Sequence, residues 1–380
     1  MTGPRIVLAP DKFKGSLSAA EVAAALARGL RRALPDAELV QTPIADGGEG
    51  TVDLVLAHGF TPRTCEVPGP LGQPVAARYA VRGDTAVAEM SAAAGLGLLP
   101  PPGPTERTAL HATTLGVGRL VADALDAGAR RVVLGVGGSA TTDGGAGALV
   151  GLGARVLTAD GAEVPPGGAV LATADRLDLS GLDPRLAGTE LVVACDVDNP
   201  LTGPEGAAAV YGPQKGATPD AVATLDAALA RWADVVAAAT GADRRGEPGA
   251  GAAGGIAFGL SSVLGARLTP GVRLLLDLTG FADTVRGAAL VVVGEGSLDA
   301  QSLRGKGPIG LAALAHEVGT PVVAAVGRSL ISPEEARAAG LGATHPLTDL
   351  EPDPERCMTE AAALLETVGR RIGEDLRARH

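Results

Sequence analysis

Lysine, cysteine and aromatic residues are scarce in this sequence, and each scarcity narrows the class of protein. Only four of the 32 basic residues are lysine, at Lys12, Lys14, Lys215 and Lys306. The three cysteines show no CxxC spacing, so neither a disulfide framework nor a zinc site is indicated, and we expect a reducing, cytoplasmic environment. Aromatic residues make up 2% of the chain, so its cores must be built from Ala, Val and Leu.

Long apolar runs and an excess of positive charge are also lacking. No apolar run reaches the roughly 18 residues that a membrane helix needs. The opening MTGPRIVLAP has no charged segment before a long apolar stretch, so we expect neither a membrane span nor a secretion signal. The net charge of −11 and a pI near 5.0 argue against a nucleic-acid partner, because a phosphate backbone demands a basic surface. A local positive loop could still bind an anionic small molecule.

Short apolar runs alternate with amphipathic stretches, which predicts an α/β protein, and a length of 380 residues predicts two domains. Near the N-terminus, Ser18 and Glu21 form a capping box for a helix between two predicted strands. The predicted elements of this domain are strands at 5–10, 38–44, 289–296 and 321–327, and a final amphipathic helix at 356–379. We therefore expect residues 1–65 and 286–380 to form one discontinuous Rossmann-like or flavodoxin-like doubly wound domain, with ligands at the carboxyl ends of its strands.

Residues 66–285 are expected to form a second α/β domain that is inserted in the first. Proline-rich turns open this region, and glycine-rich loops follow its buried strands. The predicted elements here are a helix at 113–127, strands at 131–139 and 190–198, and a helix at 218–239.

Two of the four lysines lie in a glycine turn directly after the first predicted strand. Such a turn lets backbone N–H groups converge on an anion, and Lys14, Gly15 and Ser16 add a charge and a hydroxyl group. The stretch GVGGSATTDGG (135–145) repeats the pattern without a lysine. The alternative for both stretches is a tight strand-to-helix turn that binds nothing. Neither matches GxxxxGK[ST], so no P-loop is indicated.

Acidic residues follow two other predicted strands. Asp46 and Glu49 bracket two glycines, where they could bind Mg²⁺ or accept a proton, or could form an Asx turn and a solvated residue. Asp196 and Asp198 leave their strand on the same side, and two such carboxylates repel unless a cation or a shared proton joins them. The alternative is that one caps the next helix and the other is solvated. Lys215 offers a second positive loop downstream.

The stretch GEGSLDAQSLRGKGPIG (294–310) concentrates polar side chains after a strand of aliphatic residues. Glu295, Asp299 and Gln301 can bind a metal or hydroxyl groups. Arg304 and Lys306 add positive charge beside a helix N-terminus, which favours an anion by itself. A capped connecting loop is the alternative, although it does not explain the concentration of charge.

Together these loops place acid, lysine and glycine at strand ends, and these groups can neutralise and align a transferring phosphoryl group. The sequence has no GxSxG, no HExxH and no GxGxxG in the right context, which argues against serine hydrolases, metal hydrolases and dinucleotide enzymes. A kinase without a Walker loop fits. A lyase or phosphatase acting on acidic sugars, and a non-catalytic effector-binding module, fit the same lysine-bearing turns.

Longer motifs add a more specific resemblance. They are APDKFKGSLSA, PIADGGEGT, GVGGSATTDGGAGAL, CDVDNPLTGPEGAA, YGPQKGA and GEGSLDAQSLRGKGPIG. In this order they resemble the glycerate kinase family found in bacterial glycolate and glucarate breakdown. The resemblance implies ATP-dependent, Mg²⁺-assisted phosphorylation of D-glycerate, typically to 2-phosphoglycerate, with 3-phosphoglycerate as the alternative product. It also implies a cleft between the two domains as the active site, and a homodimer is a further option.

The sequence departs from the family pattern at three positions. Lys12 stands where the family often has serine, Thr142 where it has asparagine, and Arg304 where it has histidine. If that histidine contacts substrate in relatives, Arg304 would alter acid specificity. We interpret it as a tolerated surface difference.

The matched motifs give each candidate residue an expected role. Lys14 and Lys306 would hold phosphate and carboxylate groups, and Asp196 would orient and deprotonate the glycerate hydroxyl. Asp46 or Asp299 would bind Mg²⁺. The remaining expected contacts to substrate or nucleotide are Lys12, Gly15, Ser16, Asp46, Gly47, Gly48, Glu49, Gly137, Gly138, Ser139, Thr141, Asp143, Lys215, Glu295 and Gln301.

Overall fold

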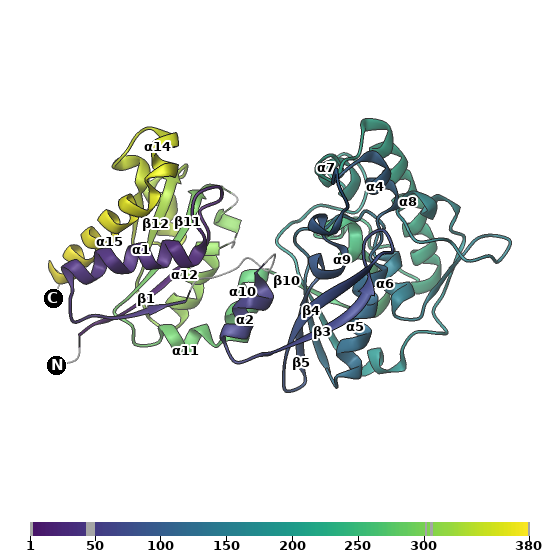
Figure 1. The fold of residues 1–380 in the computed structure, drawn as a ribbon, viewed down its shortest axis with the longest axis horizontal. Coiled ribbons are helices and arrows are strands. Elements are labelled where there is room, and N and C mark those ends of the chain that lie inside the picture. The colour runs from purple at the N-terminus through teal and green to yellow at the C-terminus, as the bar shows by residue number, and fades with distance from the viewer. Residues whose placement is uncertain (1–2, 43–49, 301, 305–306, 379–380) are drawn as a thin grey trace. The chain divides into compact units, whose positions relative to one another are not determined.

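The computed structural model describes residues 3–42, 50–300, 302–304 and 307–378 (Figure 1). The chain divides into two compact units, unit 1 with residues 1–46 and 272–380, and unit 2 with residues 47–271. Both units combine helices with parallel strands, which confirms the expected α/β class. The unit bounds differ from the expected 65/66 and 285/286. The strand at 61–68 pairs within the sheet of unit 2, and the helices that span 271–285 pack in a core of unit 1.

Unit 1 is built on a five-stranded parallel sheet in the order β13-β12-β11-β1-β2. Its strands are β1 (Arg5–Pro10), β2 (Glu38–Gln41), β11 (Leu290–Leu298), β12 (Val322–Ser329) and β13 (Ala343–Pro346). The central strands are runs of buried aliphatic residues, as expected for strands covered on both faces. Strands from the two ends of the chain pair directly, since β1 lies beside β11.

Helices pack on both faces of this sheet. On one face α1 (Ala19–Ala33) and α15 (Ala361–Ala378) lie side by side (Figure 1) and share one core with the sheet. On the other face lie α10 (Gly271–Thr279), α11 (Phe281–Val285), α12 (Gly307–Glu317) and α13 (Pro333–Ala338). The predicted capping box of α1 is confirmed, because Ser18 and Glu21 bond each other's backbone. The predicted C-terminal helix is divided at Glu360 into α14 (Pro354–Thr359) and α15.

Unit 2 contains a six-stranded mixed sheet in the order β10-β9-β6-β5-β4-β3. The first four strands of this order are parallel, and β3, β4 and β5 form an antiparallel meander. The strands are β3 (Thr61–Pro68), β4 (Pro74–Arg82), β5 (Thr85–Glu89), β6 (Arg131–Gly135), β9 (Glu190–Ala194) and β10 (Arg267–Thr269), with β7 (Arg155–Leu157) and β8 (Arg176–Asp178) as a separate pair.

Most helices of unit 2 pack around one main core, in which Trp232, Tyr79 and Phe258 are the largest buried aromatic residues. The helices of this unit are α2 (Thr51–Ala57), α3 (Ser91–Ala94), α4 (Glu106–His111), α5 (Leu115–Asp126), α6 (Ala146–Gly151), α7 (Ala207–Tyr211), α8 (Pro219–Thr240) and α9 (Ala252–Leu264). Among the described helices of both units, none combines the length and apolarity that crossing a membrane requires.

Candidate active site

The turn that directly follows β1 in unit 1 carries Lys12, Lys14, Gly15 and Ser16, and we refer to it as the lysine turn. The backbone N–H groups of Ser16 and Leu17 donate to the carbonyl of Phe13, and Gly15 adopts a φ of 79°, which a side chain would disfavour. Phe13 is buried under the turn, whereas Lys12 and Lys14 are exposed. The turn therefore presents its two ammonium groups to solvent at the carboxyl end of the sheet.

A cavity of about 490 Å³ opens beside this turn, and we refer to it as the unit 1 cavity. It is lined by the turn, by the last residues of β11 and β12, and by the segment that follows β13. Its lining residues are Asp11, Lys12, Phe13, Lys14, Ser16, Glu295, Gly296, Ser297, Gly327, Arg328, Leu347, Thr348, Pro354, Cys357, Met358 and Ala361. The structure thus gathers Lys12, Lys14, Ser16 and Glu295 around one cavity, with Gly15 in the same turn.

Glu295 is a partly buried acid in the wall of this cavity. Burial raises its pKa to about 7, a hydrogen bond with Ser302 opposes the rise, and the Asp299 and Asp11 carboxylates add to it. Its Oε1 atom is buried and has no hydrogen-bond partner among the described residues. A carboxyl group in this state can carry or release a proton near neutral pH.

Asp299 lies in the loop that follows β11. Its Oδ1 accepts a hydrogen bond from Ser302 N at 3.3 Å, and its own N–H donates to Ser302 Oγ at 3.2 Å. Within the described ranges no group of three or more His, Cys, Asp or Glu side chains could hold a metal ion. Magnesium usually needs just one or two protein carboxylates in addition to phosphate and water oxygens, so Asp299 suits this ion. Several other expected residues lie outside the described residues, namely Asp46, Gly47, Gly48, Glu49, Gln301 and Lys306.

In unit 2 the expected residues fall into two groups. The first lies where the parallel strands end. Asp196 follows β9, is partly buried, and accepts a hydrogen bond from Gly271 N at 3.0 Å on Oδ1. Gly137, Gly138 and Ser139 follow β6 in a loop that the backbone of residues 94–96 holds in place. The carboxyl ends of β6 and β9 are neighbours, so this group lies at one edge of the sheet.

The second group is in the interior of unit 2. Asp143 is 1% exposed and accepts hydrogen bonds from Thr113, Thr114 and the glycine N–H groups that follow it. Burial raises the pKa of Asp143, and the hydrogen bonds from Thr114 oppose the rise. Lys215 is also 1% exposed, and its Nζ donates to the Thr141 carbonyl at 2.6 Å. Burial lowers the pKa of Lys215 to about 7, and the Asp143 carboxylate opposes this shift.

Thr141, Asp143 and Lys215 therefore lie inside unit 2 rather than on its surface. The side chain of Thr141 is fully buried, and its hydroxyl has no partner in the described part of the chain. Lys215 reaches from η4 (Pro213–Lys215) to the backbone of the loop that follows β6. Any influence of Thr141, Asp143 and Lys215 on a ligand would pass through the shape of this loop.

The sequence motifs did not point to three residues, two near strand ends and one in helix α14. Arg328 is the next-to-last residue of β12 and donates from Nε to Ser297 Oγ at 3.1 Å, so it has the same strand-end position as the residues that were singled out. Glu89 closes β5, accepts a hydrogen bond from Val52 N at 2.7 Å, and has a pKa that burial raises. Met358 lines the unit 1 cavity, and its sequence context gives no signal of this.

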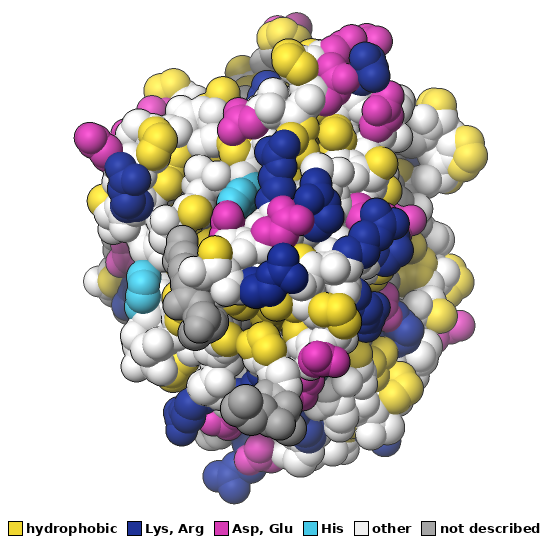
Figure 2. Space-filling model, turned by 90° about the vertical axis from the view of Figure 1, so that its left-hand side faces the viewer, with side chains coloured by type: hydrophobic (Ala, Val, Ile, Leu, Met, Phe, Trp, Pro, Cys, Tyr) yellow, Lys and Arg dark blue, Asp and Glu magenta, His cyan; other side chains and the backbone are white. Residues whose placement is uncertain are grey.

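Positive charge is local rather than spread over a broad surface. Figure 2 shows Lys and Arg side chains interspersed with Asp and Glu on the face that it presents. In unit 1 several arginines are paired, including Arg28 and Arg32 with Glu366, and Arg370 with Glu374. The lysine turn therefore places two ammonium groups beside the cavity within a surface of mixed charge, and Asp11 and Glu295 line the same cavity.

Comparisons with known proteins identify the family of this chain. A sequence model of the glycerate kinase family matches residues 6–377. The chain belongs to the glycerate kinase family. It is 44% identical over 377 residues to a glycerate kinase of Bacillus subtilis (strain 168), with 98% of each chain covered. It is also 44% identical over 326 residues to a glycerate 2-kinase of Escherichia coli (strain K12), with 85% of each covered.

A solved structure extends the family relation to the fold. The crystal structure of a protein assigned as glycerate kinase 2 from Salmonella typhimurium LT2 matches with a TM-score of 0.82 and 41% identity, and the match covers 99% of each chain. The resemblance predicted from the sequence motifs is thereby confirmed, and with it the expectation that the chain is an enzyme of the glycerate kinase family.

Proposed function

We propose that this enzyme transfers the γ-phosphoryl group of ATP to D-glycerate and forms 2-phosphoglycerate. The observation that carries the proposal is the match along nearly the whole chain to glycerate kinases. The 2-position is supported by the relative named glycerate 2-kinase. The lysine turn of unit 1 and the acidic residues at strand ends are groups of the kind that phosphoryl transfer needs.

Asp196 is the proposed proton acceptor. When the glycerate hydroxyl oxygen attacks the γ-phosphorus, its proton must leave, and a carboxylate within hydrogen-bonding reach can take it. The hydrogen bond from Gly271 N holds the Asp196 carboxylate in one orientation at the end of β9. Such fixed orientation favours transfer because alignment of the reacting groups contributes much of the rate.

Lys14 and Lys306 are proposed to hold phosphate and carboxylate oxygens, together with the N–H groups near Gly15 and Gly138. Lysine suits this role as a compact point charge on a flexible stem. Lys14 is exposed at the cavity. We assign Mg²⁺, which when bound would neutralise charge on the phosphate oxygens, to Asp46 or Asp299.

The experiment is to measure ADP release from the purified full chain with ATP and Mg²⁺, comparing D-glycerate, L-glycerate and tartronate. We expect sustained release that is selective for D-glycerate. Release that is independent of any hydroxy acid would contradict the proposal, and so would its absence with all three acids.

A further inference from the structure

The strands β1 and β11 are neighbours in the sheet, yet the chain leaves them toward opposite faces. After β1 it enters α1, which shares a core with α15, and after β11 it enters α12, in the core on the other face. Connections that diverge in this way leave a crevice beyond the carboxyl ends of the strands, where open α/β sheets bind ligands. The unit 1 cavity is lined by the residues that follow β1 and by the ends of β11 and β12.

The lining of this cavity has a polar side and an apolar side. The polar side carries the cations of Lys12, Lys14 and Arg328, the carboxyl groups of Asp11 and Glu295, and the hydroxyls of Ser16 and Ser297. The apolar side comes from the segment after β13, which contributes Leu347, Pro354, Cys357, Met358 and Ala361. A three-carbon hydroxy acid has no surface that matches the apolar side. A nucleotide has both an aromatic base and a chain of phosphates.

Met358 is the large exposed side chain on the apolar side. Its side chain is 49% exposed, although large apolar side chains are rarely so exposed in the described part of this chain. The methionine thioether is polarizable and makes favourable contacts with aromatic rings. Met358 lines the cavity, so a ligand ring that enters the cavity can pack against its thioether.

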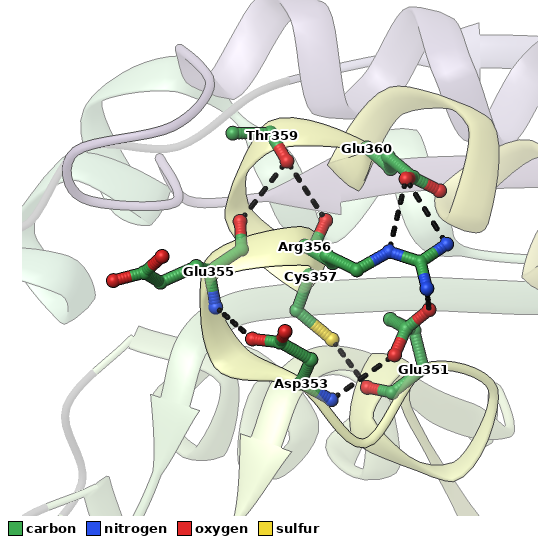
Figure 3. A network of polar contacts seen from close by, with 7 residues as sticks. All are labelled: Glu351, Asp353, Glu355, Arg356, Cys357, Thr359 and Glu360. Atoms are coloured by element: carbon green, nitrogen blue, oxygen red, sulfur yellow. Dashed lines mark hydrogen bonds and ion pairs between the residues drawn. The ribbon is translucent and has the colours of Figure 1, made fainter.

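The helix that carries Met358 is held firmly in spite of its length of six residues (Figure 3). Arg356 bridges Glu351 and Glu360 through its guanidinium group. Cys357 Sγ donates to the Glu351 carbonyl at 2.8 Å, and Asp353 caps the first turn of α14. This network fixes the backbone of α14, so that Met358 has its position on the apolar side of the cavity before a ligand binds.

One hydrogen bond joins Met358, on the apolar side of the cavity, to the lysine turn. Ser16 Oγ donates to the Met358 carbonyl at 2.6 Å, which joins residues 342 positions apart. A Cβ atom on Gly15 would lie 3.2 Å from the Met358 methyl carbon, so the turn and the wall are in direct contact. The spacing between the two sides of the cavity is therefore set before any ligand binds.

We propose that the unit 1 cavity is the nucleotide site, with the adenine ring against Met358 and the phosphates toward Lys12, Lys14 and Arg328. The choice of an adenine nucleotide rests on the proposed function. The division of the cavity into a base side and a phosphate side rests on the lining residues alone.

The test is direct binding to the full chain without glycerate, measured by calorimetry with ATP, adenosine and inorganic tripolyphosphate. Met358→Gln replaces the thioether by a polar side chain of similar length, and Leu330→Gln is its matched control. Leu330 is 62% exposed in the same unit but does not line the cavity. Lys14→Met removes one cation from the phosphate side.

We expect Met358→Gln to weaken ATP and adenosine about fivefold to tenfold and to leave tripolyphosphate unchanged, because a polar amide loses the apolar and sulfur contacts with the ring. Lys14→Met should weaken ATP and tripolyphosphate and leave adenosine unchanged. Met358→Leu, which keeps the wall apolar, should bind adenosine within about twofold of the original chain. Equal affinities for adenosine in Met358→Gln and Leu330→Gln would overturn the proposal.

Failure of this inference can be told apart from failure of the proposed function. Normal ADP release with D-glycerate, together with an unchanged KM for ATP in both Met358→Gln and Lys14→Met, would overturn the nucleotide site and leave the function intact. The expected binding pattern without any ADP release would support the nucleotide site and contradict the function.

Discussion

The three described lysines occupy two kinds of environment. Lys12 and Lys14 are exposed beside the unit 1 cavity, whereas Lys215 is buried in unit 2 and bonded to a backbone carbonyl. The scarcity of lysine in the sequence singled out all of them. Burial could not be predicted, because it depends on packing between η4 and a loop that is about 70 residues away.

Burial of Lys215 has a consequence for stability. In the folded chain its pKa is lowered from 10.5 to about 7, so between these values the unfolded state binds more protons. The free energy of unfolding should therefore rise with pH across this window. Below pH 7 Lys215 is protonated in both the folded and the unfolded state, so its buried charge destabilises the folded state to the full extent there. We expect this rise between pH 7 and 9 to be reduced in Lys215→Met when unfolding is followed in urea.

Lys12→Met is the matched control for this prediction, because Lys12 is exposed. It should keep the pH dependence of the original chain. If Lys215→Met and Lys12→Met show the same dependence, Lys215 is not the group that titrates in this range.

Asp196 is the residue on which the proposed chemistry depends most. Asp196→Asn keeps the shape and the hydrogen bond from Gly271 but cannot accept the proton, so kcat should fall by roughly 10²-fold or more. The KM values should change much less. Asp198→Asn, at the exposed carboxylate two residues on, is the control and should stay within about threefold. Near-normal kcat in Asp196→Asn would remove this residue from the role.

At the scale of elements, the close packing of α1 on α15 is a defining feature of unit 1. Both helices use glycine at the contact, and a Cβ atom on Gly29 would lie 1.9 Å from the Glu366 carbonyl oxygen. Gly369 meets the Leu26 carbonyl in the same way, at 2.3 Å. The two backbones approach so closely that neither site has room for a methyl group.

Gly29→Ala should therefore destabilise the protein. In an exposed helix this change stabilises by about 0.5–1 kcal/mol, but here we expect a loss of about 1–3 kcal/mol from overpacking. The measurement is the free energy of unfolding in urea. Gly97→Ala is the control, since no atom lies within 4 Å of the Cβ it would add. A more stable Gly29→Ala chain would show that the helices are not packed this closely.

Elements that local patterns specify were predicted well. The strand at 5–10, the capping box of α1 and the helix at 218–239 have clear apolar periods or capping residues, and the structure contains them. The break at Glu360 was not predicted, because the apolar period continues across it. Contacts that are distant in sequence, such as Ser16 Oγ to the Met358 carbonyl, hold α14 apart from α15.

For the whole molecule, the sequence predicted two domains, the first of them built from both ends of the chain. The alternation of strands and helices at both ends indicated a shared sheet, and β1 does pair with β11. The candidate site was predicted less completely. Motifs identify residues at strand ends, as for Lys14 and Glu295, but they do not separate surface residues from buried ones such as Asp143. They also cannot find Met358, whose place at the cavity is set by tertiary packing alone.

The reaction that we propose for this member of the glycerate kinase family is phosphorylation of the 2-hydroxyl of D-glycerate. The most direct measurement is phosphorus NMR of the product formed by the purified chain from ATP, Mg²⁺ and D-glycerate, with authentic 2- and 3-phosphoglycerate as standards. We predict the 2-phosphoglycerate resonance, appearing in proportion to the ADP released. A 3-phosphoglycerate resonance in its place, or ADP without any phosphoglycerate, would contradict it.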